Sequence, residues 1–234
     1  MTITIGFDVY GTLIDTHGVV AALELFIGDS ARDFSATWRD KQLEYSFRRG
    51  LMGAYENFAV CTANALEYTA LFYKIALTGE QKKDLLAVYR TLPPFADVKE
   101  GLTRLQEGGF RLYAFSNGSA EAVETLLAGA GIRDFFLGVV SVDDLKTFKP
   151  NPAVYRHFLR KSGAAGSGAW LISGNPFDVI GAISAGMKAA WVKRAPEAIF
   201  DPWGIEPTII VPGLADLREK IAACQQSAGE ANAV

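Results

Sequence analysis

The chain has little cysteine, no long hydrophobic run and no block of charge of one sign, and each absence excludes a class of protein. Of its 234 residues only Cys61 and Cys224 are cysteines, and they fit no metal spacing, so we interpret them as free thiols in a reducing cytoplasm. No apolar run approaches the ~18 residues of a membrane span, and the first residues enter a strand without a signal-like stretch. The 23 Lys and Arg residues nearly balance the 26 Asp and Glu residues, so neither nucleic acid nor an anionic membrane is indicated as a partner.

What is present is an alternation of short β-rich runs with segments of helical length. Hydrophobic residues make up 50% of the chain and charged residues 21%, a composition that supports a packed core. Because parallel strands need crossover connections, the alternation predicts a doubly wound, Rossmann-like parallel sheet with helices on both faces, an α/β fold. The predicted strands are 2–8, 110–115, 136–141, 169–173, 188–193 and 207–211, and the predicted core helices are 99–108, 119–130, 151–163, 176–186 and 213–226.

The connection between the first two predicted strands is far longer than a crossover requires. It contains four further helical patterns, separated mainly by glycines and closed by Pro93-Pro94, over residues 17–28, 31–49, 54–75 and 79–91. We therefore predict a core domain made of residues 1–15 and 99–234. A helical cap domain, residues 16–98, is inserted into it over the C-terminal edge of the sheet.

Polar residues gather where four successive predicted strands end. Because the carboxyl ends of parallel strands face one crevice, these groups are expected to converge there. Their convergence indicates a functional site more strongly than any one of them does. The four groups are Asp8, Ser116-Asn117-Gly118-Ser119, Lys149-Pro150, and Ser173-Gly174-Asn175 with Asp178.

Asp8 is the central candidate, because a carboxylate is a usable nucleophile once it is stripped of water and aimed. Burial would favour the neutral acid, so a fixed cation is needed to keep it charged, and Lys149 is the candidate. Ser116 and Asn117 open a predicted helix and offer an anion site. Asp178 could orient or deprotonate a water molecule. Each of these residues also has a purely structural alternative, as a helix cap or as an acid that favours the helix dipole.

The four polar segments resemble, in order, the motifs of the haloacid dehalogenase superfamily. Asp8-Val9-Tyr10-Gly11-Thr12 is similar to the nucleophile motif, and the later motifs look like Phe115-Ser116-Asn117, Lys149-Pro150 and the stretch from Ser173 to Asp178. The resemblance covers the whole chain, cap included. It implies the fold predicted above, with the active site between core and cap.

Within that superfamily the chain resembles the L-2-haloacid dehalogenases. The phosphatase members have a second Asp where this chain has Tyr10, and they carry more acids near the fourth motif to hold Mg²⁺. A halide leaving group needs neither a proton nor a metal, so the resemblance implies no cofactor and no metal. The cap segment around Arg39 is similar to the family segment that carries a halide-binding arginine, whose permanent charge would stabilise the departing anion.

The resemblance implies a reaction in two steps. Asp8 displaces halide from C2 of an L-2-haloalkanoate, and water then cleaves the aspartyl ester at the Asp8 carbonyl, which gives a D-2-hydroxy acid. Halide leaves toward Arg39 and Asn117, Ser116 holds the substrate carboxylate, and Thr12 and Tyr155 lie near Asp8 and Lys149. The expected catalytic residues are Asp8, Thr12, Arg39, Lys149, Ser173, Asn175 and Asp178, and the expected substrate-binding residues are Tyr10, Leu43, Phe58, Ser116, Asn117, Tyr155 and Phe177.

The sequence departs from the family at Gly174 and Phe177, where Ser and Trp are more usual, and at Asp40, where Gln is more usual. These departures leave the preferred halogen and chain length open. A Mg²⁺-dependent phosphatase of the same superfamily is one alternative function, and a haloacetate or fluoroacetate dehalogenase is another. A protein that only binds a small acid is a third. Family likeness also suggests a homodimer, formed through the aromatic-rich residues 58–73.

Overall fold

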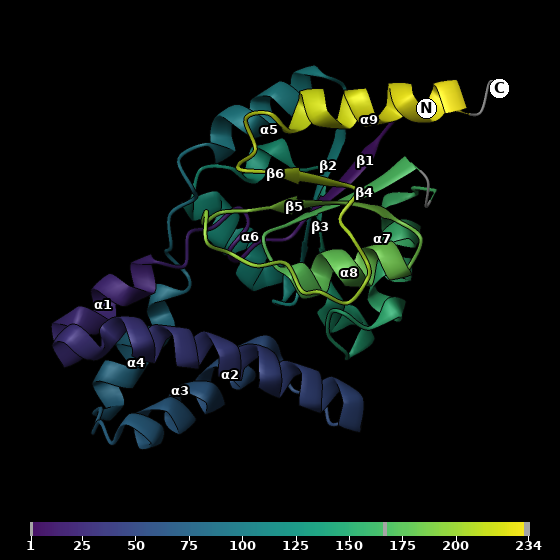
Figure 1. Ribbon diagram of the computed structural model, residues 1–234. Coiled ribbons are helices and arrows are strands. Elements are labelled where there is room, and N and C mark those ends of the chain that lie inside the picture. Colours follow the sequence, from purple (N-terminus) through teal and green to yellow (C-terminus); the bar gives the residue numbers. More distant parts are fainter. Residues whose placement is uncertain (1, 166–167, 232–234) are drawn as a thin grey trace.

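The computed structural model describes residues 2–165 and 168–231, and the described residues form one parallel sheet of six strands (Figure 1). The strand order is β3-β2-β1-β4-β5-β6, and every neighbouring pair is parallel. This is the order of a doubly wound sheet, in which the direction of winding reverses beside β1. The strands are β1 (Thr4–Phe7), β2 (Arg111–Ser116), β3 (Gly138–Ser141), β4 (Ala169–Ser173), β5 (Lys188–Val192) and β6 (Ile209–Val211).

Helices cover both faces of the sheet, and each face has its own apolar cluster. One cluster joins Ile5 of β1 to side chains of α5 (Val98–Glu107), α6 (Ala120–Gly129) and α9 (Leu217–Ala231). The other joins Leu171 of β4 to side chains of α7 (Pro152–Ser162) and α8 (Pro176–Ser184). The predicted fold class is therefore confirmed.

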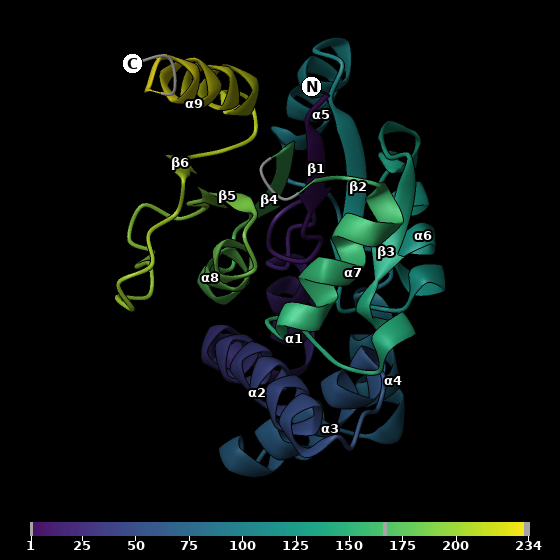
Figure 2. The same ribbon diagram turned by 90° about the vertical axis from the view of Figure 1, so that its right-hand side faces the viewer.

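The long connection after β1 forms four helices that lie together at the opposite end of the molecule from α9 (Figures 1 and 2). They are α1 (Gly18–Ile27), α2 (Ala31–Met52), α3 (Phe58–Tyr73) and α4 (Gly79–Val88). Two backbone hydrogen bonds join the segment that leaves the sheet to the segment that returns to it. They run from Asp15 N to Pro93 O (2.8 Å) and from Phe95 N to Leu13 O (3.0 Å). This helical insertion corresponds to the predicted cap, whose limits at residues 16 and 98 stay a prediction.

Several element ends differ from those predicted, because side-chain and glycine caps set them. α2 runs through Gly50 to Met52 and is capped by Gly53, whose φ of 64° is left-handed, so the predicted break after residue 49 is wrong. α3 begins only at Phe58, because the Asn57 side chain accepts a hydrogen bond from Val60 N (3.1 Å) and caps the helix. α9 runs to Ala231, past the predicted end at 226. Within the described residues no helix combines the length and the apolar character that a membrane span requires.

Candidate active site

Asp8 lies one residue past β1 and accepts four side-chain hydrogen bonds. Its Oδ2 atom accepts from Asn175 Nδ2 (2.7 Å), Thr12 Oγ1 (2.8 Å) and Ser173 Oγ (3.3 Å), and its Oδ1 atom accepts from Lys149 Nζ (3.1 Å). The carboxylate is buried, and its residue keeps only 8% of its surface exposed. The donors come from the ends of β1 and β4 and from the loop after β3, so the convergence expected from the parallel sheet is present. They hold the carboxylate in one orientation.

Lys149 joins Asp8 to a second buried carboxylate, that of Asp178. Its Nζ atom donates to Asp178 Oδ2 (2.7 Å) and to the Phe115 carbonyl oxygen (2.8 Å), as well as to Asp8. Burial opposes the charge of Lys149, but the two carboxylates, Asp178 first, outweigh burial and raise its pKa. Burial raises the pKa of Asp178 to about 6, with a further upward contribution from the charge of Asp8 and a downward one from Lys149.

Tyr155 reaches this network through Asp178 and lies away from the pocket. Its hydroxyl donates to Asp178 Oδ1 (2.7 Å) and the side chain is fully buried, in the cluster under α7 and α8. Burial, together with the charge of Asp178, raises the pKa of Tyr155 well above its ordinary value. Tyr155 is therefore linked to Lys149 through Asp178, as expected, but it does not line the pocket as a substrate-binding residue would, because its ring packs against Phe115 of β2.

Ser116 is the last residue of β2, and Asn117 begins the loop that leads into α6. Ser116 Oγ accepts from Gly118 N (3.1 Å), and Asn117 Oδ1 accepts from Lys149 N (2.9 Å). Asn117 therefore fixes the backbone of the loop that carries Lys149. The α6 N-terminus is capped by Ser119, which accepts from Ala122 N (3.4 Å).

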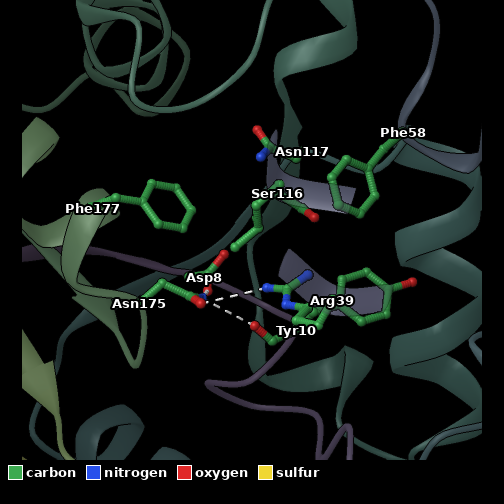
Figure 3. Close-up of a pocket in the computed structure, with 9 residues that line it drawn as sticks. Asp8, Tyr10, Arg39, Phe58, Ser116, Asn117, Asn175 and Phe177 are labelled. Carbon is green, nitrogen blue, oxygen red and sulfur yellow. Dashed lines mark hydrogen bonds between the residues drawn. The ribbon is translucent and has the colours of Figure 1, made fainter. Parts of the chain in front are cut away.

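A small pocket lies above Asp8, between the sheet and the helical insertion (Figure 3). Arg39 enters it from α2, and its Nη2 atom donates to Asn175 Oδ1 (3.4 Å). The neighbouring Asp40, a departure from the family, is exposed. The predicted residues that line the pocket are Asp8, Tyr10, Arg39, Leu43, Phe58, Ser116, Asn117, Asn175 and Phe177.

Phe47 is a residue of the site's surroundings that the sequence analysis did not identify. It lies on α2, four residues after Leu43 and eight after Arg39, so helical periodicity places all three on one face. Its ring meets that of Phe177 edge to face, with centroids 5.1 Å apart. The spacing of these three residues was the available signal, and it would have pointed to Phe47.

Tyr10 forms the opposite side of the pocket. Burial raises its pKa to about 12, with a smaller contribution from Tyr89, so the hydroxyl is protonated at neutral pH. That hydroxyl donates to the Tyr89 carbonyl oxygen over a long 3.5 Å, and the two rings meet edge to face with centroids 6.1 Å apart. Tyr89 in turn accepts from Gln42 Nε2 (2.7 Å), so α2 supports this wall as well.

Gly174 lies where the loop after β4 passes close to the turn after β1. Its backbone N donates to Thr12 Oγ1 (2.8 Å), and a Cβ atom at this position would lie 2.4 Å from the Gly11 carbonyl oxygen. Only glycine fits such an approach without a shift of backbone. Close packing against Gly11 therefore explains why this chain has Gly174 where the family more often has serine.

The groups around Asp8 do not form a ligand set for Mg²⁺. Mg²⁺ binds oxygen acceptors, whereas the atoms directed at Asp8 are ammonium, amide and hydroxyl donors. Within the described part of the chain, no three His, Cys, Asp or Glu side chains are grouped so that they could hold a metal ion.

Comparisons with known proteins agree with this geometry. Residues 4–186 match the family model described as haloacid dehalogenase-like hydrolase. The chain is 38% identical to haloacetate dehalogenase H-2 of Moraxella sp. (strain B), over 89% of this chain and 92% of that protein. It is 34% identical to the (S)-2-haloacid dehalogenase of Pseudomonas sp. (strain YL), over 97% and 96%.

Among solved structures, the L-2-haloacid dehalogenase of Xanthobacter autotrophicus superposes with a TM-score of 0.89 at 30% identity, over 95% of this chain and 99% of that one. The same enzyme has also been solved with chloropropionic acid covalently bound, with a TM-score of 0.88. The family match covers most of the chain, and the relatives are matched almost end to end. This chain belongs to the haloacid dehalogenase-like hydrolases, among their haloacid dehalogenases.

Proposed function

We propose that this protein is an (S)-2-haloacid dehalogenase, a hydrolase that converts L-2-haloalkanoates to D-2-hydroxy acids. In the first step a carboxylate oxygen of Asp8 attacks C2 from the side opposite the halogen. The C–O bond forms as the carbon–halogen bond breaks, and the halogen leaves with the bonding electrons as halide. Asp8 is suited to this role because it is buried, fixed by four donors and at the floor of the pocket.

Arg39 and Asn117 are proposed to receive the halide. Both line the pocket, and Arg39 reaches it from the insertion while Asn117 reaches it from the end of β2. A guanidinium is always charged and only weakly hydrated, so in a nearly dry pocket it stabilises the negative charge that grows on the departing halogen. Ser116, with nearby backbone N–H groups, is proposed to hold the substrate carboxylate.

Hydrolysis of the Asp8 ester is proposed to use Asp178 as the base. A water molecule attacks the Asp8 carbonyl carbon and gives its proton to Asp178. As the ester C–O bond on the Asp8 side breaks, Asp178 returns that proton to the departing alkoxide oxygen, which releases the hydroxy acid, and the proton left on the new Asp8 carboxyl group passes to solvent. The negative charge of Asp8 contributes to the raised pKa of Asp178. Esterification removes that charge, so the pKa of Asp178 falls when the base is needed and the ionised form is favoured. Ser173, Asn175 and Lys149 help to orient the groups, and Thr12 and Tyr155 support them.

The single observation that carries this proposal is the placing of Arg39 and Asp8 on either side of one Asn175 side chain. Asn175 Nδ2 donates to Asp8, and Asn175 Oδ1 accepts from Arg39. A cation is thus held beside the carboxylate that forms the new bond. The alternative of a Mg²⁺-dependent phosphatase has less support, since Lys149 lies between the acids and Tyr10 stands where the phosphatases have a second Asp.

A haloacetate dehalogenase is the second candidate, and the size of the pocket favours it. The volume open inside the pocket is about 20 Å³, enough for about one water molecule. A two-carbon acid would require the smallest movement of Leu43, Phe58 and Phe177. The 38% identity to haloacetate dehalogenase H-2 supports the same candidate.

The test is halide release, in the presence of EDTA, from each enantiomer of 2-chloropropionate and from chloroacetate and fluoroacetate. We expect turnover of the L enantiomer with inversion to the D-hydroxy acid, and none with Asp8→Asn. Preference for chloroacetate would favour the second candidate. In a single turnover in ¹⁸O-water the label should enter Asp8 and not the product, and label that appears first in the product would rule out the ester.

We also propose that the protein is cytoplasmic and forms a homodimer. A cytoplasmic location is supported by Cys61 and Cys224, both free thiols. A homodimer through α3 is supported by the exposed side chains of Leu71 (77%) and Phe72 (59%). Sedimentation equilibrium of Phe72→Glu against the unaltered protein would test the dimer, and an unchanged mass would exclude α3 as its interface.

A further inference from the structure

A second, much larger hollow lies next to the active-site pocket. It is a groove between α3 and α4 of the insertion and the beginning of α6, and its volume is about 830 Å³ against about 20 Å³ for the pocket. Tyr10 and Phe58 line both spaces, so these two side chains form the wall that separates them. The groove also reaches Gly118 and Ser119, directly after the loop with Asn117.

The remaining sides of the pocket are tied together. Arg39 is hydrogen-bonded to Asn175, Asn117 to the backbone of Lys149, and Phe177 is packed against Phe47. The Tyr10 hydroxyl is held only by its 3.5 Å hydrogen bond, and the Phe58 ring meets that of Phe148 at a centroid distance of 6.2 Å. Tyr10 also meets the ring of Tyr89 edge to face at 6.1 Å, so ring contacts and one long hydrogen bond hold this wall, whereas side-chain hydrogen bonds fix Arg39 and Asn117.

The groove is lined by three basic side chains and two acidic ones, Glu67 and Glu121, and the surplus positive charge favours anions. Lys83 and Arg90 line it, both are exposed, and neither has an ion-pair partner among the described residues. Arg90 is close enough to Tyr10 that its charge acts on the Tyr10 hydroxyl. Lys82, also in the lining, is neutralised by Glu67 (2.7 Å), which leaves Glu121 on the opposite wall as the one acid of the lining without such a partner.

We propose that this groove is the access route for the anionic substrate, and that Lys83 and Arg90 draw the carboxylate toward the Tyr10–Phe58 wall. The proposal rests on the proposed function, because a haloacid, a hydroxy acid and a halide are all anions. A pocket with room for about one water molecule admits a haloacid only when a wall moves. A groove with positive charge at that wall raises the local concentration of the anion at the point of access.

Charge reversal tests the steering. Lys83→Glu/Arg90→Glu should lower kcat/KM for chloroacetate about tenfold at low ionic strength, should not lower kcat, and should lose most of its effect at high salt. The matched control is Arg156→Glu/Lys220→Glu, which makes the same change of net charge at exposed positions on α7 and α9. An unchanged kcat/KM in the first variant, or an equal fall in the control, would overturn the steering.

Obstruction tests the route itself. Ala87→Trp places a large side chain at an exposed position of the groove lining and should lower kcat/KM at every ionic strength. Ala222→Trp, exposed on α9, is the control and should not. Thermal unfolding of each variant separates obstruction from loss of fold. If the unaltered protein releases no halide, the proposed function fails. If it does release halide and Ala87→Trp is as active, only the access route is wrong.

Discussion

The Nη2 atom of Arg39 donates a hydrogen bond to Oδ1 of Asn175 over 3.4 Å, and this contact joins the helical insertion to the sheet directly beside Asp8. Asn175 passes the connection on, since its Nδ2 atom donates to Asp8 Oδ2 over 2.7 Å. The insertion therefore holds a cation against the same amide side chain that binds the Asp8 carboxylate. For this reason we expect Arg39 to be the residue of the insertion on which the proposed chemistry most depends.

Substitution of Arg39 should affect the first step far more than it affects folding. Arg39→Gln removes the charge that stabilises the departing halide, and we expect a fall in kcat of about 10²–10³, the loss typical when a preorganised donor is removed from a transition state. Arg39→Lys keeps the charge but not the planar fork, so it should recover only part of the activity. Rapid-quench measurement of halide release checks this.

The control for Arg39 is Arg48→Gln, which removes an exposed arginine from the same helix, away from the pocket. Arg48 makes an exposed ion pair with Glu44, so its loss should change neither the activity nor the melting temperature measurably. Full activity in Arg39→Gln would mean that another group receives the halide.

Lys149 should be necessary for both stability and activity. Lys149→Met leaves the carboxylates of Asp8 and Asp178 buried without the cation between them, and breaking a buried pair in this way costs about 3–5 kcal/mol. We expect a loss of that size in the free energy of unfolding by urea at neutral pH, together with loss of halide release.

Two further variants test whether the unpaired carboxylates cause the loss of stability. Lys149→Met/Asp178→Asn removes one of the stranded charges and should recover part of the stability but none of the activity. Lys161→Met, at a lysine whose side chain is 58% exposed, should be as stable as the unaltered protein. If Lys149→Met alone unfolds at the same urea concentration as the unaltered protein, the buried carboxylates do not depend on this lysine.

The order of the elements and the crevice could be predicted from the sequence, because both follow from pattern. Alternating β-rich and helical runs specify a parallel sheet, and parallel strands bring Asp8, Ser116 and Ser173 to the same edge. Helix ends were less predictable, since they depend on single contacts. Gly50 looks like a helix break in sequence, yet it lies inside α2 where that helix approaches the Phe148 loop.

The finer features of the site depend on distances that the sequence does not contain. The raised pKa of Asp178 results from its burial and from its place beside Lys149 and Asp8, and none of these can be read from the motif alone. The sequence likewise does not reveal that Tyr155 contacts Asp178 instead of lining the pocket, because this depends on how its ring packs in the cluster with α8. Phe47 is different, because its helical spacing from Arg39 was visible.

Hydrolysis of the ester should depend on pH through Asp178. Burial raises the pKa of Asp178 to about 6 in the free protein, and the charge of Asp8 adds to this rise. Asp178 accepts a proton only when it is ionised. The rate of ester hydrolysis should therefore be highest above the pKa of Asp178 and should fall as the pH falls through that pKa. Because the ester lacks the charge of Asp8, we expect the midpoint below pH 6.

The measurement is a single turnover followed by intact-protein mass spectrometry, which records the decay of the Asp8 ester against pH. Asp178→Asn should accumulate the ester at every pH, because the amide cannot accept the proton of the attacking water. A midpoint above pH 6, or ester that decays at the normal rate in Asp178→Asn, would assign the base to another group.

Gly174 should tolerate no side chain, even though the neighbouring residues of the loop carry one. A Cβ atom there would lie 2.4 Å from the Gly11 carbonyl oxygen, so Gly174→Ala must displace backbone on one side of the site or the other. Overpacking of this kind costs about 1–3 kcal/mol.

The displacement would also lengthen the hydrogen bond from Gly174 N to Thr12 Oγ1, and Thr12 in turn orients Asp8. We therefore expect lower thermal stability and slower formation of the ester. Gly129→Ala is the control, because a Cβ atom at that residue meets nothing within 4 Å and the residue lines neither the pocket nor the groove. If Gly174→Ala melts at the same temperature as Gly129→Ala and forms the ester at the same rate, the close approach is not a constraint on this site.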